Sequence, residues 1–404
     1  MNRLGVAVLL AVSLTASHAA QQAPSDPDSI LLGRIKARIS GSLRQLPNYT
    51  CVQTIERSRR LAQSRRFQLV DTLRLEVALV NGKELFSWPG AGKFEERELS
   101  DIVGGGAAIG NGNFALHARN IFMTNAPEFT PMGEHELEGV RTIRFDYRVP
   151  MSRSSYRVRS GDASGIAGYR GSFWVNASTL DLIRLDVHVN EIPSQVPLSR
   201  VSDTMEYARV PIGESTFVLP RQSQLHMVDL KGNESLNMTR FSGCRQYTGE
   251  STLVFDDPPD LPEDEEETAA LPEHIPPRLT VYGRLGVALD TKTVARGDLV
   301  TVTIERPVRK DRAVLIPRGA MLRGRVMAVL RIGTSIQSRT GVHIDFYELE
   351  VAGQTMPFRA RIQAAPPHHT APDGTIYSRS SNFELRPGLR MALLTLETPP
   401  EEPQ

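Results

Sequence analysis

Hydrophobic residues change their spacing near residue 48, from every fourth position to every second position. Four aliphatic residues recur every four positions along the first segment: Leu31, Ile35, Ile39 and Leu43. This spacing places side chains on one face of an α-helix. Asp26 and Pro27 are residue types that favour a helix cap and a first helical position, and Pro47 favours an end. The pattern predicts one core-facing helix between Pro27 and Pro47.

The segment that follows has the alternation of β-strands. Aliphatic residues occupy every second position in one stretch: Leu73, Leu75, Val77 and Leu79. Asn81-Gly82 comes next and is a strong signal for a two-residue hairpin turn. The stretches "GVRTIRFDYRV", "GYRGSFWVNASTLDLIRLDVHV" and "FVLPRQSQLHMV" repeat the alternation. A helix followed by such strands predicts a curved antiparallel sheet wrapped over that helix, in a domain of residues 26–255.

Residues 278–398 also alternate, and no helical spacing interrupts them. Two short runs show the pattern: Leu285, Val287 and Leu289, then Val300, Val302 and Ile304. Gly297-Asp298 and the Pro317 to Gly319 stretch favour turns. We expect a small all-β barrel or sandwich, so the fold class is mainly β (α+β).

Residues 256–277 contain nine acidic residues and six prolines. This composition predicts an extended linker between the two domains, with an acidic recognition strip as the alternative.

The first residues, "MNRLGVAVLLAVSLTASHAA", have the order of a secretory signal peptide. Arg3 precedes an apolar run of about 13 residues, shorter than the roughly 20 that a membrane-spanning helix needs. Ser17-His18-Ala19 offers a cleavage site, so we expect residues 1–19 to be removed. No cysteine follows this site to carry a lipid, and no later segment has spanning length. We expect a periplasmic or secreted protein.

Two cysteines are present, Cys51 and Cys244. In an oxidising compartment two thiols usually form a disulfide, whereas a metal site needs more ligands at short spacing. The sequence predicts a disulfide between them, with two buried free thiols as the alternative.

Composition and motifs indicate no enzyme. The net charge of +1 gives no support to a nucleic-acid partner. Gly110, Gly112 and Ala115 have the spacing of a dinucleotide fingerprint, but that fingerprint needs a βαβ unit, and here we expect a flexible loop over residues 104–112. His343 and Asp345 would share one strand face without a third ligand. We therefore expect no catalytic residues, no metal and no cofactor.

Five arginines stand between the first two predicted strands: Arg57, Arg59, Arg60, Arg65 and Arg66. Because arginine forks match phosphate geometry, they are candidates for contacting anionic envelope components. The alternative is a solvated hairpin tip.

Two parts of the chain resemble known families. The predicted helix, "YTCVQTIERSRR", "FSWPG" and "GSFWVNASTLDLIRLDV" together resemble the half-barrel of periplasmic lipoprotein carriers and of the sigma-factor regulatory proteins related to them. The stretch "AVLIPRGAMLRGRV" is similar to the C-terminal barrel of TrbI-type conjugation proteins. The whole chain also resembles exported bacterial proteins with no assigned role.

These observations favour a non-enzymatic envelope protein. The half-barrel would bind a lipid or another apolar ligand, or an extended polypeptide, and the small barrel would dock an envelope protein partner. A structural accessory of a secretion or conjugation-type complex is the alternative, and a hydrolase ranks third. Loop 104–112 would gate the ligand site. The candidate ligand-binding residues are Leu73, Leu75, Val77, Leu79, Trp88 and Trp174; the alternative is that the interior is fully packed.

Overall fold

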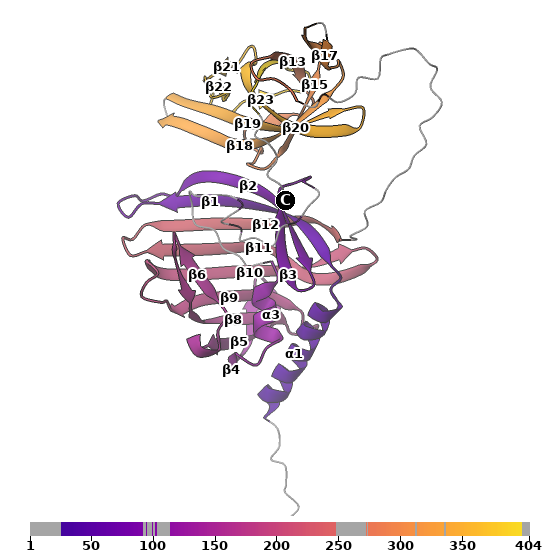
Figure 1. Ribbon diagram of the computed structural model, residues 1–404. Helices are drawn as coiled ribbons and strands as arrows, with labels where there is room; N and C mark the ends of the chain where they lie inside the picture. Colours follow the sequence, from indigo (N-terminus) through magenta and orange to yellow (C-terminus); the bar gives the residue numbers. More distant parts are fainter. Residues whose placement is uncertain are drawn as a thin grey trace, which may run out of the picture.

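The computed structural model of the chain describes residues 26–91, 94, 99, 102, 114–247, 272, 274–311, 313–334 and 337–397. The predicted signal peptide (1–19), the predicted gate (104–112) and most of the predicted linker (256–277) lie outside the described residues. The described part is mainly β, as predicted, and consists of a large curved sheet with helices near it and a separate closed barrel (Figure 1).

The large sheet contains ten antiparallel strands in the order β3-β2-β1-β12-β11-β10-β9-β8-β5-β4. Its strands are β1 (Tyr49–Arg60), β2 (Gln68–Val80), β3 (Lys83–Ser87), β4 (Glu128–Leu137), β5 (Val140–Val149), β8 (Gly168–Asn176), β9 (Leu182–Glu191), β10 (Leu198–Ile212), β11 (Ser215–Asp229) and β12 (Glu234–Gln246). The other elements of this half are α1 (Pro27–Gln45), α3 (Leu116–Phe122), the 3-10 turn η1 (Met151–Arg153) and the hairpin β6 (Arg157–Ser160) and β7 (Ala163–Ile166). Because β12 returns beside β1, the last strand of the sheet pairs with the first.

Local sequence signals account for several of these elements. Asn81 and Gly82 both have positive φ, 52° and 81°, which is the geometry of a type I′ turn. They join β2 to β3, so the predicted hairpin is confirmed. Helix α1 begins at Pro27, and the side chains of Ile35 and Ile39 are buried. The predicted cap is wrong: Asp26 makes no side-chain hydrogen bond to the helix amides.

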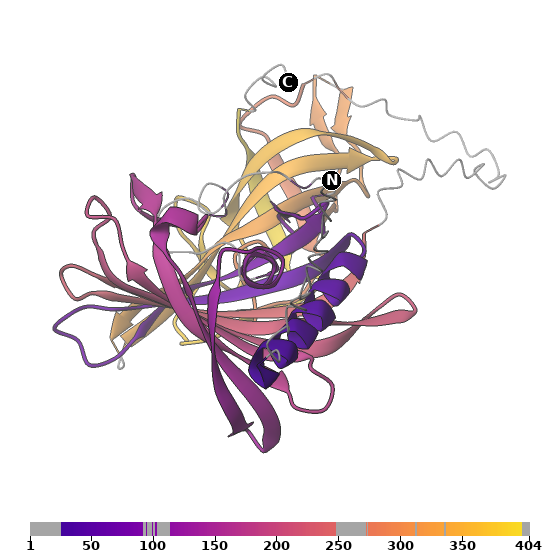
Figure 2. The same ribbon diagram turned by 90° about the horizontal axis from the view of Figure 1, so that it is seen from below.

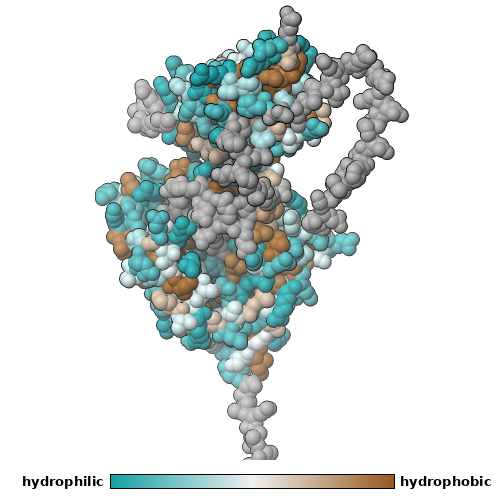
Figure 3. Space-filling view, in the orientation of Figure 1, coloured by the Kyte–Doolittle hydropathy of each residue, from teal (hydrophilic) through white to brown (hydrophobic). Residues whose placement is uncertain are grey.

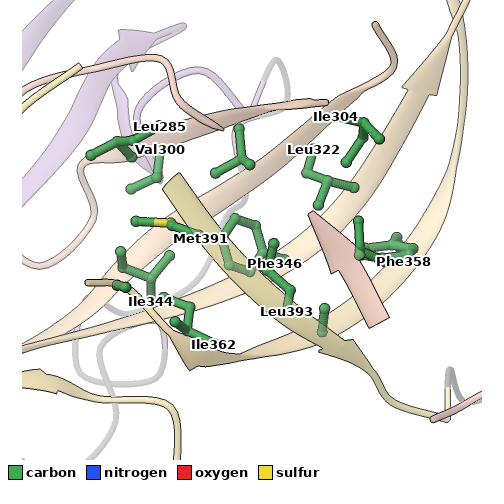
Figure 4. Close-up of a cluster of buried hydrophobic side chains, with 14 of the residues drawn as sticks. Leu285, Val300, Ile304, Leu322, Ile344, Phe346, Phe358, Ile362, Met391 and Leu393 are labelled. Atoms are coloured by element: carbon green, nitrogen blue, oxygen red, sulfur yellow. The ribbon is translucent and has the colours of Figure 1, made fainter. Parts of the chain in front are cut away.

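The C-terminal strands close into a barrel. Six of them pair in the order β18-β15-β13-β24-β20-β19, and a further β18–β19 pairing closes the ring. The strands of this half are β13 (Thr280–Leu285), β14 (Leu289–Asp290), β15 (Leu299–Ile304), β16 (Val308–Lys310), β17 (Ala313–Ile316), β18 (Met321–Thr334), β19 (Gln337–Val351), β20 (Gln354–Ala364), β21 (His369–Thr370), β22 (Ile376–Ser378), β23 (Glu384–Leu385) and β24 (Arg390–Thr395). Figure 4 shows the apolar side chains that fill the barrel, among them Leu322, Phe346 and Leu393. Of the two predicted architectures, the barrel is the one observed.

The predicted disulfide is confirmed. Cys51 in β1 and Cys244 in β12 are bonded, with their Cα atoms 4.1 Å apart. The bond joins the first and last strands of the large sheet at the place where those strands are neighbours. It therefore fastens the two ends of the sheet segment to each other.

The barrel contacts the large sheet at the edge of β2. Strand β3 covers only residues 76–80 of β2, and the uncovered part pairs with the barrel segment before β15. The amide N–H of Arg74 donates to the carbonyl of Arg296 (2.8 Å), and the amide N–H of Arg296 donates to the carbonyl of Thr72 (2.8 Å). The Arg74 guanidinium also contacts the Asp298 carboxylate at 2.5 Å. The two halves thus share main-chain pairing and an ion pair.

Candidate functional site: the concave face of the large sheet

The concave face of the large sheet is covered by α1 and α3, and Figure 2 shows the sheet curving around both helices. Half of this face is one apolar cluster, formed by the helices with β5, β8, β9 and β10. Its buried members include Ile35, Ile39, Leu43, Ile121, Phe122, Phe145, Phe173, Leu185 and Met205. The aromatic rings are in contact: Phe145 stacks on Phe173 with centroids 5.5 Å apart.

The other half of the concave face is formed by β1, β2 and β3. The strand alternation places all four candidate leucine and valine residues here, with 0–4 % of their surface exposed: Leu73, Leu75, Val77 and Leu79. They pack with Tyr49, Phe114 and Phe241. A cavity of about 20 Å³ lies elsewhere on this face, between α1 and strands β10 and β11, and is lined in part by Leu43, Tyr207 and Val218. In the described part of the chain these four side chains are buried in the core.

Buried polar groups interrupt the apolar surface near α3. His117 and Asp203 have only 4 % and 3 % of their surface exposed, and His117 Nε2 lies 3.8 Å from Asp203 Oδ2. Neither His117 Nε2 nor Asp203 Oδ1 has a hydrogen-bond partner. The His117 ring stacks on Tyr156 at 5.3 Å. Two facing polar atoms without partners are uncommon in a protein interior, because each one costs desolvation free energy.

Burial sets the charge state of this pair. It raises the pKa of Asp203 to about 7 and lowers the pKa of His117 to about 4. The negative charge of Asp186 also raises the pKa of Asp203, whereas a hydrogen bond from the Thr204 amide lowers it. Both side chains are therefore mostly uncharged just below neutral pH. In that state they offer a hydrogen-bond donor and acceptor without a net charge.

This pair is not among the residues predicted from the sequence. Asp203 occupies an inward position of β10, between the buried Val201 and Met205. A polar residue in the apolar phase of a strand is the signal that points to it. His117 lies on the seven-residue helix α3, which is too short for its hydrophobic spacing to define a face.

The two candidate tryptophans lie in different surroundings. Trp174 lies between the inward-facing Phe173 and Val175 in β8, so its ring is on the opposite face, between the guanidinium groups of Arg144 and Arg184, each 5.3 Å away. Trp88 lies at the contact with the barrel, where Arg325 stacks on its ring at 5.6 Å. Trp88 also packs against the apolar cluster that contains Leu73 and Leu75.

The five candidate arginines divide into two groups. Arg57 is 1 % exposed and donates two hydrogen bonds to Asp71, at 2.7 and 2.5 Å. It is therefore not available to an external anion, and the expectation for this residue is wrong. Arg60 is ion-paired with Glu234. The remaining three are exposed: Arg59, Arg65 and Arg66.

A wider cleft lies where the barrel meets the large sheet. Its volume is about 410 Å³, and its lining includes Arg74, Leu289, Val294 and Asp298.

Within the described ranges, no three His, Cys, Asp or Glu side chains are grouped to hold a metal ion. None of the described helices is both long and apolar enough to span a membrane. On the side of the molecule that Figure 3 shows, the hydrophobic side chains form several separate groups among mostly hydrophilic ones.

No protein family model matches the sequence, and no curated protein sequence matches it either. Two solved structures are similar in part. A DUF1329 family protein from Desulfovibrio piger has 12% identity and a TM-score of 0.32, over 56% of this chain and 96% of its own. A putative outer membrane lipoprotein-sorting protein domain from Vibrio parahaemolyticus has 9% identity and a TM-score of 0.30, over 54% of this chain and 93% of its own. Neither likeness assigns a function to this chain.

Proposed function

We propose that this protein is a non-enzymatic binding protein of the cell envelope. Its large curved sheet would hold an apolar ligand, such as an acyl chain or an extended hydrophobic polypeptide. The barrel would dock an envelope protein partner, and residues 256–277 would link two domains with separate cores. The signal-peptide pattern in residues 1–19 supports an exported location.

One observation carries this proposal: His117 Nε2 and Asp203 Oδ1, both without a hydrogen-bond partner, lie buried on a mainly apolar face of the sheet. Binding sites for small apolar molecules are typically apolar walls with a few polar groups that orient the ligand. His117 Nε2 and Asp203 Oδ1 are such groups: the His117 ring stacks on Tyr156, and Asp203 lies between the buried Val201 and Met205 in β10. A ligand with one carboxylic acid, amide or hydroxyl group would satisfy both atoms and place its apolar part along the sheet.

The packing of the helices on the concave face defines the binding step. A cavity of about 20 Å³ is smaller than one methylene-rich chain, so a ligand must move α1 or α3 away from the sheet. Ile39 and Leu43 of α1 cover β9 to β11 by apolar contact, and such contacts can be replaced by a ligand of similar polarity at little net cost.

The test is a titration of the purified mature protein with dansyl-labelled undecanoic acid and, separately, with a dansyl-labelled hydrophobic peptide. Emission of the probe itself is followed. We expect saturable binding of one probe. Asp203→Leu should weaken it by about tenfold, the value of one lost hydrogen bond. Val218→Trp should abolish it by filling the space beneath α1.

Val140→Trp is the matched control, because Val140 is 38 % exposed at the turn between β4 and β5. It adds the same ring without touching the interior and should leave binding unchanged. Absence of saturable binding for both probes, or equal losses in Val218→Trp and Val140→Trp, would refute the proposal.

A further inference from the structure

Three hairpin ends meet at one end of the large sheet, on the left of Figure 1. They are the loop between β1 and β2 (61–67), the loop between β9 and β10 (192–197) and the turn between β11 and β12 (230–233). Hydrogen bonds hold them together. The Ala62 amide donates to Asn233 Oδ1 at 3.3 Å, and the Leu230 amide donates to the Pro197 carbonyl at 3.3 Å. We call this surface the hairpin end.

Apolar side chains are exposed at the hairpin end. Of the twelve large hydrophobic residues that are exposed in the described part of the chain, five lie here: Leu61 (51 %), Phe67 (38 %), Leu69 (43 %), Val70 (43 %) and Leu230 (68 %). Single exposed hydrophobic residues need no explanation, but a group of neighbours on one surface usually marks an interaction site.

The charge of the hairpin end is positive. Residues 57–71 and 229–234 contain six basic and three acidic side chains, so their net charge is +3. The acidic groups have local partners: Asp71 binds Arg57, Glu234 binds Arg60, and Asp229 accepts hydrogen bonds from the amides of residues 231 and 233. The exposed Arg59, Arg65 and Arg66 are thus not neutralised by these carboxylates.

We propose that the hairpin end docks on the surface of an anionic phospholipid membrane. The exposed aliphatic side chains and Phe67 would enter the boundary between headgroups and acyl chains. Arg59, Arg65 and Arg66 would bind lipid phosphates, for which the planar guanidinium offers paired donors. This role is separate from ligand binding on the concave face.

The shape of the hairpin end favours a membrane over a protein partner. Its apolar residues project from hairpins and strand ends, and neither of the two cavities described above lies there. A protein partner usually receives an anchor residue in a pocket or offers one, whereas a bilayer accepts separate projecting side chains. The hairpin of β18 and β19 extends toward the same end in both views, and Arg331 and Arg339 beside its tip are exposed (Figures 1 and 2).

The experiment measures co-sedimentation of the full mature protein with lipid vesicles. Vesicles of phosphatidylcholine alone are compared with vesicles of phosphatidylcholine and phosphatidylglycerol in equal parts, at low and high salt. We expect binding to the anionic vesicles that decreases with salt. The double change Arg65→Glu and Arg66→Glu should reduce binding by about a hundredfold. Leu61→Ser with Leu230→Ser should reduce it by about tenfold or more, because two apolar side chains are lost.

Each double variant has a matched control elsewhere on the surface. Arg309→Glu with Arg318→Glu makes the same charge change at exposed positions of the barrel, and Met132→Ser with Val140→Ser removes exposed apolar groups at the β4–β5 hairpin. Both controls should bind as the unchanged protein does. Circular dichroism and an intact disulfide would establish that all variants fold.

Three results would overturn the proposal: no binding to anionic vesicles at low salt, equal binding to both kinds of vesicle, or equal losses in the hairpin-end variants and their controls. Capture of an acidic protein by the hairpin end, without vesicle binding, would also overturn it and would identify a protein partner instead.

Discussion

Removing the disulfide is the sharpest test of the fold. In Cys51→Ala with Cys244→Ala, residues 193 positions apart in the chain are no longer linked in the unfolded state. The loop-closure model gives a loss of about 5 kcal/mol for a loop of this length, and measured losses are often smaller. The native sheet should persist, because β1 and β12 still pair from Tyr49–Gln246 to Arg60–Glu234.

Urea unfolding followed by tryptophan fluorescence measures the loss. Both tryptophans, Trp88 and Trp174, lie in the large-sheet half, so their emission reports the part of the chain that the disulfide closes. The unlinked chain exposes more surface on unfolding, so its dependence on urea should also be steeper. Reduced unchanged protein should behave like the alanine variant, and a reducing agent should have no further effect on the variant.

Two outcomes would contradict this reasoning. One is a free energy of unfolding that changes by less than about 1 kcal/mol, which would mean that the unfolded chain is already compact without the link. The other is alkylation of two thiols in native, unreduced protein, which would show that the bond does not form.

Three further predictions concern the buried pair and the contact between barrel and sheet. In Asp203→Asn, the free energy of unfolding should rise between about pH 4 and 6.5, because burial lowers the pKa of His117 to about 4 and the unfolded state binds more protons in this range. In the unchanged protein Asp203 opposes this rise, since burial raises its pKa to about 7. Urea titrations of both proteins at several pH values measure the difference. Gly297→Ala should separate the barrel from the sheet, because φ of Gly297 is +109° and the new Cβ would lie 2.2 Å from the Arg74 carbonyl oxygen. The control is Gly388→Ala, where φ is +83° and no atom lies within 4 Å of the new Cβ. Faster hydrogen exchange of the Arg74 amide in Gly297→Ala would reveal the separation, and equal exchange in both variants would contradict it. Asp298→Asn removes the partly exposed ion pair with Arg74 and should weaken the contact by about 1 kcal/mol, measured by the same exchange; no change would mean that main-chain pairing alone holds the contact.

Features that depend on neighbouring residues could be predicted from the sequence. The spacing of Ile35 and Ile39, the Asn81-Gly82 turn and the alternation of Val300, Val302 and Ile304 each act within a few residues, and the structure has them in the predicted form. The alternation of Leu285, Val287 and Leu289 did not predict a continuous strand, because β13 ends at Leu285 and β14 begins at Leu289. The disulfide could be predicted because only one pairing of two cysteines exists.

Features that depend on topology could not be predicted. His117 and Asp203 are 86 positions apart and meet only because α3 packs against β10. The face of Trp174 depends on which phase of β8 is inward, and both phases of that strand contain aromatic residues. The main-chain pairing of Arg296 with β2 has no local sequence signal, because Gly297-Asp298 also has the composition of an ordinary turn.

The two edges of the large sheet are protected against aggregation in different ways. At one edge, β4 carries Pro131, a register shift between Pro131 and Gly133, and exposed Glu134 and Glu136, all of which discourage pairing with another chain. On the other side the last strand, β3, pairs only with residues 76–80 of β2, which leaves the edge of the preceding part of β2, with its alternating Leu73 and Leu75, without a strand of this sheet. There the protein's own barrel occupies the uncovered hydrogen-bonding positions. A fragment cut before the barrel would therefore expose a strand edge that the intact chain keeps away from other molecules, and cleavage between the two halves would generate a self-associating species.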